Sequence, residues 1–150
     1  MTIRQLSLFL ENRPGQLRAP CAALGAAGID ILTMSLADTQ QFGILRLVVK
    51  DWEKARAVLE QAGCVVNVSD VLAVDVPDRP GGLAEVLAVF EQHGVGVEYM
   101  YAFTHRERGR TATLLFRLAD PATAAKLLGA GGVKVVEADE LFRRVGAGSP

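Results

Sequence analysis

The sequence predicts an α+β protein made of two consecutive units, residues 1–69 and 70–145, each with the element order β-α-β-β-α-β. The first observation is an internal repeat, because ENRPGQL at residues 11–17 recurs as PDRPGGL at residues 77–83, an offset of 79 − 13 = 66 residues. The second is that apolar residues alternate before each copy and recur at helical spacing after it. The same offset joins further pairs along the chain: Leu6 and Leu72, Ala22 and Ala88, Gly28 and Gly94, Met34 and Met100.

In the first unit, an alternating apolar run predicts a strand that ends at Asn12, and a helical pattern follows over residues 16–27. Pro20 falls early in that pattern and removes a hydrogen bond, so the helix either begins near Arg18 or kinks. Asp51 is a suitable N-cap for a second helix over residues 52–62. The strands expected in this unit are residues 3–12, 29–37, 44–49 and 64–68.

The second unit repeats this order with a longer central turn over residues 105–110. One helix is indicated by an apolar stripe that Gly94 ends, and a second by Asp120 followed by Pro121. The stripe consists of Leu83, Val86, Leu87 and Phe90, and the expected strands are residues 71–76, 95–103, 111–118 and 133–136. Leu141 and Phe142 then predict a short docked tail, and residues 146–150 are expected to be loose.

This order is the split β-α-β, ferredoxin-like plan, in which both helices cover one face of an antiparallel sheet. Each second strand lies at a sheet edge, and such an edge is usually paired or covered. The second strand of the first unit is apolar on both sides, with Leu32, Met34 and Leu36 on one and Ile29 and Ile31 on the other. It therefore predicts a homodimer that buries the backs of the sheets. Pairing of the two second strands, and strand exchange across the short link at residues 68–70, are open alternatives.

Composition and charge exclude several classes of function. The 150 residues carry a formal net charge of −1, and half of them are hydrophobic. A core is therefore expected, and charge-driven binding to nucleic acid or a membrane surface is not. The local cluster of Arg106, Arg108 and Arg110 around Glu107 is interpreted as a solvated hairpin tip. Residues 1–10 do not resemble a signal peptide and charges interrupt every apolar run, so we expect a cytoplasmic protein.

Candidate catalytic and metal-ligating groups are sparse. Cys21 and Cys64 are far apart and lie among apolar residues, which indicates buried thiols rather than a disulfide or a zinc site. His93 and His105 fall at a helix end and in a turn, without a nucleophile at a recognisable spacing. Glu98 is an isolated carboxylate on a strand. We therefore expect no catalysis, no cofactor and no metal.

The repeated stretch has the chemistry of a small anion-binding site. Its Pro fixes the backbone and its Gly lets a ligand approach bare N–H groups. The helix that follows begins with unpaired donors and partial positive charge, which suit a carboxylate. Asn12 or Asp78 can either cap that helix or bind an amine. The plainer interpretation is that each copy is only a strand-to-helix turn.

Two such units, each with N/D-R-P-G-x-L at its first turn and G-[I/V]-x-[I/V] opening its second strand, resemble tandem ACT domains over residues 3–136. The resemblance implies a regulatory site for a free amino acid and leaves no segment for a catalytic domain. The regulatory domains of phosphoglycerate dehydrogenase and the small subunit of acetolactate synthase share this theme. The turn of one unit would hold the charged ends of the ligand. The second strand of the other unit would form the opposite wall, which places the site at the interface between the two units.

Carried over from the resemblance, the turn positions are Asn12, Arg13, Pro14, Gly15 and Leu17 in the first unit and Asp78, Arg79, Pro80, Gly81 and Leu83 in the second. The wall position that is often Asn or Asp in the family falls on Asp30 in the first unit. It falls on Gly96 in the second, which is a departure that would make the two sites unequal. Met34 or Met100 would line the side-chain pocket, and the sequence does not indicate which amino acid fits it.

Three functions are compatible with the sequence. The first is an amino-acid sensor without chemistry of its own. The second is an accessory regulatory subunit of an amino-acid biosynthetic enzyme, which differs from the first only in its partner. The third is a small acylphosphatase-like enzyme, which would use an Arg in a turn and an Asn, but the sequence offers it no further catalytic group.

Overall fold

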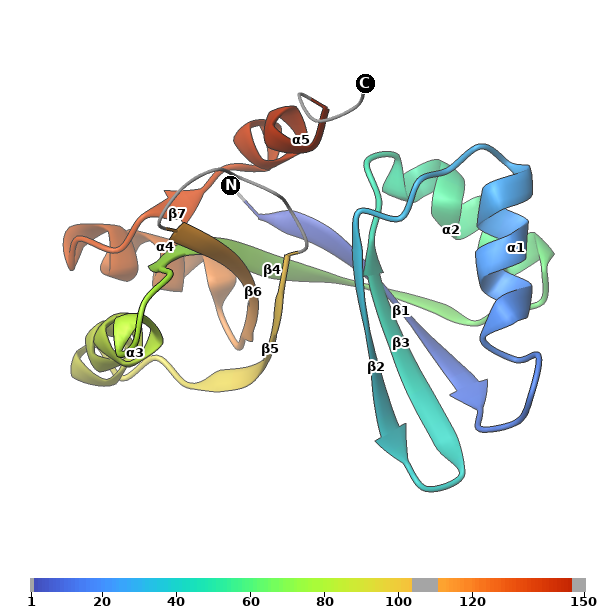
Figure 1. Cartoon of the computed structure of the whole chain (residues 1–150), viewed down its shortest axis with the longest axis horizontal. Helices are drawn as coiled ribbons and strands as arrows, with labels where there is room; N and C mark the ends of the chain where they lie inside the picture. The colour runs from blue at the N-terminus through green and yellow to red at the C-terminus, as the bar shows by residue number, and fades with distance from the viewer. Residues whose placement is uncertain (1, 104–110, 147–150) are drawn as a thin grey trace. The chain divides into compact units, whose positions relative to one another are not determined.

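The computed structural model describes residues 2–103 and 111–146, and the chain divides into two compact units (Figure 1). We call Arg4–Ser69 the N-terminal unit, and Met1–Ile3 with Asp70–Pro150 the C-terminal unit. The elements are β1 (Ile3–Glu11), α1 (Arg18–Ala26), β2 (Thr33–Thr39), β3 (Phe42–Val48), α2 (Trp52–Gln61), β4 (Val66–Pro77), α3 (Gly82–Gln92), β5 (Val97–Ala102), β6 (Thr111–Leu118), α4 (Pro121–Ala130), β7 (Val135–Val136) and α5 (Ala138–Gly146). The predicted α+β fold, two ferredoxin-like β-α-β-β-α-β units, is confirmed, with α5 added after the second.

Each unit forms its own part of the sheet in the order that this plan requires. The order is β2-β3-β1-β4 in the N-terminal unit and β7-β4-β6-β5 in the C-terminal unit. The pairs β2–β3, β3–β1, β7–β4, β4–β6 and β6–β5 are antiparallel. Along this strand order, β2 has β3 as its neighbour and β5 has β6. The second strand of each unit is therefore an edge strand, as the sequence predicts.

The strand β4 is longer than the sequence predicts. Two strands separated by a link at residues 68–70 were predicted, but Val66–Pro77 is one continuous strand of 12 residues. The polar residues in its middle do not interrupt it because their groups are hydrogen-bonded in extended conformation. The Ser69 hydroxyl accepts a hydrogen bond from the Gln5 side-chain amide at 3.2 Å. The Asp70 carboxylate accepts one from the Thr2 hydroxyl at 2.9 Å, and the Asp70 backbone carbonyl accepts one from the Arg117 guanidinium at 3.1 Å.

The core of the N-terminal unit lies between its sheet and the helices α1 and α2. Leu24 of α1 and Leu59 of α2 are fully buried against alternate residues of β1 and β3. The buried strand residues of this core are Leu6, Leu8, Leu10, Leu45 and Leu47. Because side chains alternate across a strand, Phe9 and Ile44 point to the opposite face of the sheet.

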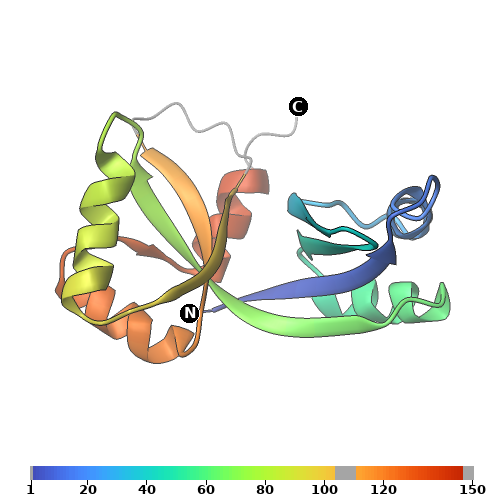
Figure 2. The same cartoon turned by 90° about the horizontal axis from the view of Figure 1, so that it is seen from below.

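The C-terminal unit is covered on both faces of its sheet. Leu72, Val74 and Val76 of β4 pack with α3 and α4 around Phe90 and Phe116, whose ring centroids are 5.0 Å apart. Figure 2 shows α5 on the opposite side of this sheet from α3 and α4. Leu141 of α5 is fully buried there. The tail predicted from Leu141 and Phe142 is thus a docked helix that extends to Gly146, and residues 147–150 lie outside the described part.

The helix starts follow local chemistry. The α1 helix begins at Arg18, which leaves Pro20 in its first turn, where a missing N–H costs little. The Asp51 side chain accepts a hydrogen bond from the Lys54 N–H at 3.1 Å, and Asp120 accepts from the Thr123 N–H at 3.0 Å. Both predicted N-caps are therefore confirmed.

The edge strand β2 differs from its prediction. It begins at Thr33 rather than at residue 29, and residues 29–32 are not part of the strand, although the Leu32 N–H donates a hydrogen bond to the Val48 carbonyl of β3 at 2.9 Å. Ile29 and Ile31 therefore pack against the N-terminal core, and the expectation that they form the second apolar side of this strand is wrong. Met34 and Leu36 are exposed on the helix-facing side, opposite Leu47 and Leu45. The turn at residues 105–110, with its arginine cluster and His105, lies outside the described residues.

Candidate functional site

The turn from β1 to α1 is tightly bent and fully on the surface. The Arg13 N–H donates to the Glu11 carbonyl at 2.8 Å, and the Gln16 N–H donates to the Arg13 carbonyl at 3.2 Å. The Arg13 guanidinium forms an exposed ion pair with the Glu11 carboxylate. Gly15 has a φ of 88°, a left-handed conformation that favours glycine. Pro14 and Leu17 are exposed in the same turn.

Asn12 is bonded to the hairpin between β2 and β3. Its backbone N–H donates to the Gln41 carbonyl at 3.0 Å, and its side-chain Nδ2 lies 3.5 Å from the Gln40 carbonyl oxygen. The N-cap of α1 is Leu17, and no side chain of the described residues caps this helix. The expectation that Asn12 could cap the helix is therefore wrong, because the helix begins too far along the chain.

The turn from β4 to α3 is shorter by two residues at its helical end. The Gly82 N–H donates to the Arg79 carbonyl and the Glu85 N–H to the Gly81 carbonyl, both at 3.0 Å. Arg79 pairs with Glu85 at 2.7 Å, and Gly81 has a φ of 82°. Asp78 and Pro80 are exposed. Leu83 turns inward and packs against the C-terminal core.

The start of α3 combines an anion with helix donors. Its N-cap is Gly81, and no side chain in the described part of the chain caps it. An uncapped helix start presents backbone N–H groups and partial positive charge. Asp78 directly follows β4 and precedes this helix by four residues, so its exposed carboxylate belongs to the same end of the strand. The arrangement offers a carboxylate for an ammonium group and N–H donors for a carboxylate.

The four predicted wall residues lie at or just before the edge strands. Asp30 and Gly96 are both exposed, in the segments that precede β2 and β5. A Cβ built on Gly96 would meet nothing within 4 Å, so this position is open space. Met34 is exposed on β2, whereas Met100 is half-buried on β5 and packs against the C-terminal core. The two methionines therefore share a repeat position but not an environment.

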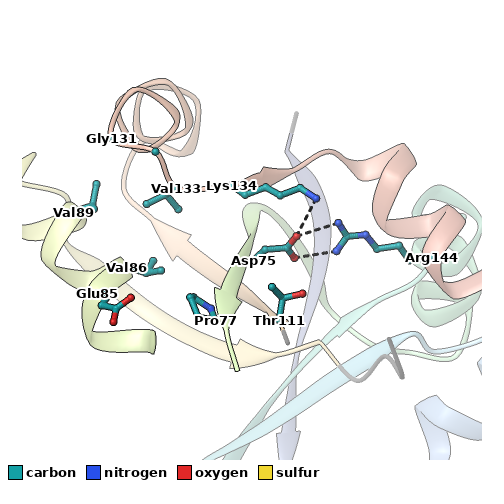
Figure 3. Close-up of a pocket in the computed structure, with 11 residues that line it drawn as sticks. Asp75, Pro77, Glu85, Val86, Val89, Thr111, Gly131, Val133, Lys134 and Arg144 are labelled. Carbon is teal, nitrogen blue, oxygen red and sulfur yellow. Dashed lines mark hydrogen bonds and ion pairs between the residues drawn. The ribbon is translucent and has the colours of Figure 1, made fainter. Parts of the chain in front are cut away.

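The C-terminal unit contains a pocket of about 410 Å³ that none of the predicted ligand residues lines (Figure 3). Its apolar wall is formed by Pro77, Val86, Val89 and Val133. Gly131 closes the wall near α3, where a Cβ would lie 2.5 Å from Cγ1 of Val89. The charged end carries Asp75, Lys134 and Arg144, and Glu85 and Thr111 also line the pocket. A smaller pocket of about 210 Å³ includes Gly96 and His93.

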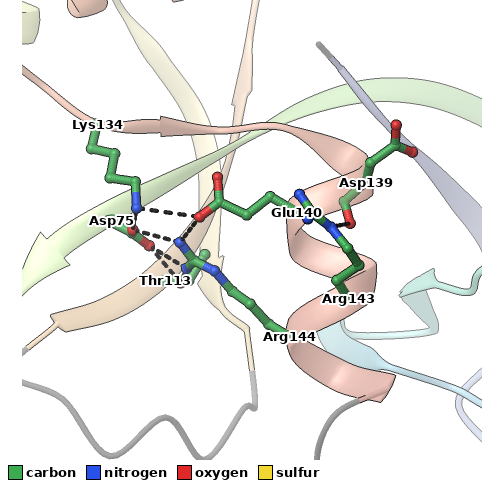
Figure 4. Close-up of polar contacts among 7 residues, drawn as sticks. All are labelled: Asp75, Thr113, Lys134, Asp139, Glu140, Arg143 and Arg144. Atoms are coloured by element: carbon green, nitrogen blue, oxygen red, sulfur yellow. Dashed lines mark hydrogen bonds and ion pairs between the residues drawn. The ribbon is translucent and has the colours of Figure 1, made fainter.

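The charged end of the larger pocket is an ion-pair network that fastens α5 to the sheet (Figure 4). Asp75 and Arg144 form a two-pronged pair, at 3.0 Å to Oδ1 and 3.1 Å to Oδ2, and their side chains are only 6% and 10% exposed. The Thr113 hydroxyl donates to Asp75 at 2.8 Å. Lys134 lies 3.3 Å from Asp75 and 3.2 Å from Glu140, and Arg144 also pairs with Glu140.

The network shifts the pKa of three of its members. Burial acts to raise the pKa of Asp75, but hydrogen bonds from Arg144, Thr113 and Lys134 outweigh it, so this pKa lies below the ordinary value. Hydrogen bonds from Arg144 and Lys134 lower the pKa of Glu140. Hydrogen bonds to Glu140 and Asp75 raise the pKa of Lys134. All of these charges therefore stay in place at neutral pH, with two of each sign.

Sequence reasoning missed this network, although a signal was present. Asp75 is the charged residue within the apolar run at residues 71–76, and Glu140 and Arg144 have the spacing of a helical ion pair. The charges are paired with each other, so the geometry indicates an anchor for α5 rather than a set of groups waiting for a ligand.

Other reactive groups form no site in the described part of the chain. No three His, Cys, Asp or Glu side chains there are placed to hold a metal ion. Cys21 and Cys64 are free thiols and only half-buried, which corrects the expectation of fully buried ones. Partial burial raises the pKa of Cys64. Among the described helices, none is long and apolar enough to cross a membrane.

Three comparisons place these features among known proteins. The model of a family described as the ACT domain pair matches residues 1–144. The crystal structure of a protein from Bacteroides thetaiotaomicron matches with a TM-score of 0.86 and 33% identity, covering 95% of this chain and 96% of that one. The ligand-free regulatory subunit of aspartate kinase from Thermus thermophilus matches with a TM-score of 0.63 and 15% identity, covering 86% and 91%. No curated protein sequence matches the chain.

Proposed function

Because the chain belongs to the ACT domain pair family, we propose that it is a regulatory protein that binds a free amino acid and catalyses no reaction. The observation that carries this proposal is the turn between β4 and α3. There the exposed Asp78 carboxylate and the uncapped start of α3 belong to the same end of one strand. The ligand's ammonium group would bind Asp78, and its carboxylate would accept hydrogen bonds from backbone N–H groups near Gly81.

The remaining parts of the expected site stay predictions. They are the first turn (Asn12, Arg13, Pro14, Gly15 and Leu17), the rest of the second turn (Arg79, Pro80 and Leu83) and the wall (Asp30, Met34, Gly96 and Met100). That the ligand lies at the interface between the two units also stays a prediction, as do the homodimer and the cytoplasmic location. We propose the second turn as the stronger site, because Asp78 is anionic and the hydrogen bonds of Asn12 are directed to the β2–β3 hairpin.

A thermal-shift screen against the proteinogenic amino acids tests the proposal first, since a ligand that binds only the folded state raises the apparent melting temperature. Calorimetry on the best ligand then compares Asp78→Ala and Asn12→Ala with the parent. Loss of a hydrogen bond to a charged group costs about 1.5–3 kcal/mol, so we expect roughly ten- to a hundredfold weaker binding for Asp78→Ala. Asn12→Ala should weaken binding less.

Glu91→Ala is the matched control, because Glu91 is an exposed carboxylate on α3 of the same unit but lies at the far end of the helix. It should bind like the parent. Equal affinity of Asp78→Ala, Asn12→Ala and the parent would show that the repeated stretch is only a turn.

We also propose that the regulated target is an amino-acid biosynthetic enzyme. Support comes from chains of this fold that are regulatory subunits of aspartate kinase, from Thermus thermophilus and, at 17% identity and a TM-score of 0.62 over 85% of this chain and 88% of that one, from Thermus flavus. At these identities the likeness concerns the fold, so the enzyme is to be identified by co-purification with and without the amino acid.

A further inference from the structure

The back of the N-terminal sheet, the face away from α1 and α2, carries an exposed apolar patch. Phe9 of β1 is paired with Ile44 of β3, and Ile44 is paired with Ala37 of β2, so all three side chains lie on this face. Phe42 lies on the same face because it is two residues before Ile44 on β3. Phe9 is 58% exposed and Phe42 is 48% exposed. We refer to Phe9, Ala37, Phe42 and Ile44 as the back patch.

The internal repeat shows how the same face is treated in the C-terminal unit. Phe9 corresponds to Asp75 at the offset of 66, and the strand partner of Asp75 is Thr113, as that of Phe9 is Ile44. In the C-terminal unit α5 covers this face, where Arg144 contacts Asp75 and Thr113 (Figure 4). Leu141 of the same helix is buried. The N-terminal unit thus carries large apolar residues where its sister unit carries a polar pair beneath a helix.

We propose that the back patch is the surface through which a second copy of this chain binds, and that α5 keeps the equivalent face of the C-terminal unit out of that contact. This specifies the surface of the homodimer proposed above and does not depend on amino-acid binding. Contiguous exposed apolar side chains on a soluble protein mark association surfaces. The polar replacement and the helix cover on the other unit indicate that assembly stops at two copies.

The charges around the back patch favour a second copy as the occupant. Arg46 and Glu11 lie on this face on either side of the pair Phe9 and Ile44, Arg46 opposite Ser7 and Glu11 opposite Phe42 at the end of β1. A two-fold axis that crosses the strands places Arg46 of each copy over Glu11 of the other, so the surface is complementary to itself. Glu11 already pairs with Arg13, and Arg46 already has an interaction within its own chain, so the contact between copies exchanges partners. Both side chains of the Glu11–Arg13 pair are more than half exposed, and such a pair is easily exchanged.

The size of the face sets the expected affinity. Three strands of about seven residues and the part of β4 in this unit, residues 66–69, present roughly 400 Å² per copy, at about 3.3 Å per residue and about 4.8 Å between strands. Two copies would then bury about 800 Å², which is below the range of stable specific interfaces and in the range of weak, transient ones. We therefore expect a dimer with a dissociation constant in the micromolar range rather than an obligate dimer.

Sedimentation equilibrium without added amino acid, at protein concentrations from about 1 to 100 µM, tests the proposal on the full chain. The parent should convert from monomer to dimer over this range. Phe9→Asp, which copies the residue of the C-terminal unit, should remain monomeric to the highest concentration. Val97→Asp is the matched control, since Val97 is an exposed apolar residue on a strand of the other unit, and it should dimerise like the parent.

A charge exchange tests the two-fold arrangement. Arg46→Glu alone should weaken dimerisation at least tenfold, and the double variant Arg46→Glu with Glu11→Arg should restore it. Circular dichroism establishes that each variant is folded. A parent that stays monomeric at about 100 µM, a Phe9→Asp variant that dimerises like the parent, or equal loss in Val97→Asp would each overturn the proposal.

Discussion

Asp75 lies where a strand that is otherwise apolar meets three elements of the C-terminal unit. Its two carboxylate oxygens accept hydrogen bonds from Arg144 of α5 and Thr113 of β6, and they form an ion pair with Lys134 in the segment before β7. A buried ion pair contributes little net stability compared with apolar residues of the same volume, but removing one partner is costly because a buried charge remains. The network therefore fixes the position of α5 more than it increases the stability of the fold.

We predict that Asp75→Asn lowers the free energy of unfolding by about 3 kcal/mol, the lower end for a broken buried pair, because Glu140 and Thr113 still contact Arg144. Urea denaturation measures this difference. Asp139→Asn, an exposed carboxyl on the same helix, is the control and should change stability by less than about 0.5 kcal/mol. A loss below about 1 kcal/mol in Asp75→Asn would show that α5 is held by Leu141 alone.

The pKa of Asp75 gives the pH dependence its sign. Since this pKa is lowered in the folded state, the pair stabilises the fold above the unfolded value near 4, and that contribution is lost as pH falls through the lower folded pKa. We expect the stability difference between the parent and Asp75→Asn to be constant from about pH 6 to 8 and to shrink below about pH 4. The raised pKa of Lys134 acts in the opposite direction, so its contribution is lost only above about pH 10.5. A stability difference that stays unchanged down to about pH 2 would contradict this assignment.

At the scale of elements, the two copies of the repeated turn start their helices differently. The α3 helix starts at Gly82, two repeat positions before α1 does, since Gly82 corresponds to Gln16 and α1 begins at Arg18. A Cβ on Gly82 would lie 2.0 Å from the carbonyl oxygen of Pro77, which is backbone and cannot move aside. Gly82 is thus what allows α3 to begin directly against the end of β4.

We predict that Gly82→Ala lowers the free energy of unfolding by about 3 kcal/mol and displaces the start of α3, because the added methyl group overlaps backbone atoms. Gly96→Ala is the matched control, since Gly96 has open space around it and should change stability by no more than about 0.5 kcal/mol. Thermal unfolding measures both variants. If the two behave alike, the close approach at Pro77 does not restrict this position.

The elements also show which features the sequence could predict. Periodicity, Asp51, Asp120 and the doubled turn predict the β-α-β-β-α-β order, because these signals are local. The fusion of two predicted strands into β4 was missed because the polar residues Ser69 and Asp70 resemble a turn until their distant hydrogen-bond partners are known. Long-range contacts of this kind are invisible to local pattern reasoning. The network around Asp75 was missed for the same reason, since its members are up to 69 residues apart.

The candidate site likewise has features that the sequence could predict and features that it could not. The sequence locates the turns because the strand-turn-helix context is local, and the structure adds that Gly15 and Gly81 adopt a left-handed conformation there. It did not predict that Asn12 would bond the hairpin, nor that Asp30 and Gly96 would precede the strands rather than belong to them. These outcomes depend on where a helix starts and where strand pairing begins, which tertiary packing decides.

For the whole molecule, the two units share one plan and differ in what covers the backs of their sheets. A gene duplication would explain the common plan, and divergence at the pair Phe9 and Asp75 would explain the difference. In the C-terminal unit α5 seals the face within the chain. In the N-terminal unit the aromatic residues of this face are exposed, and the proposed second copy would cover them. The chain therefore has one sheet face suited to the proposed dimer contact, whereas two identical units would have two such faces.

The proposed dimer predicts that the melting temperature depends on protein concentration. If the native protein is a dimer and the unfolded chain is a monomer, a hundredfold rise in concentration stabilises the dimer by at most about 2.7 kcal/mol, or about 1.4 kcal/mol per chain. For a chain of this length that corresponds to a rise of roughly 3–5 °C in melting temperature. The native parent is expected to convert from monomer to dimer between about 1 and 100 µM, so its rise over this range should be smaller, roughly 2–3 °C, and Phe9→Asp should show a constant melting temperature. A constant value in the parent would place the back patch outside any interface, and an equal rise in Phe9→Asp would place the interface elsewhere on the molecule.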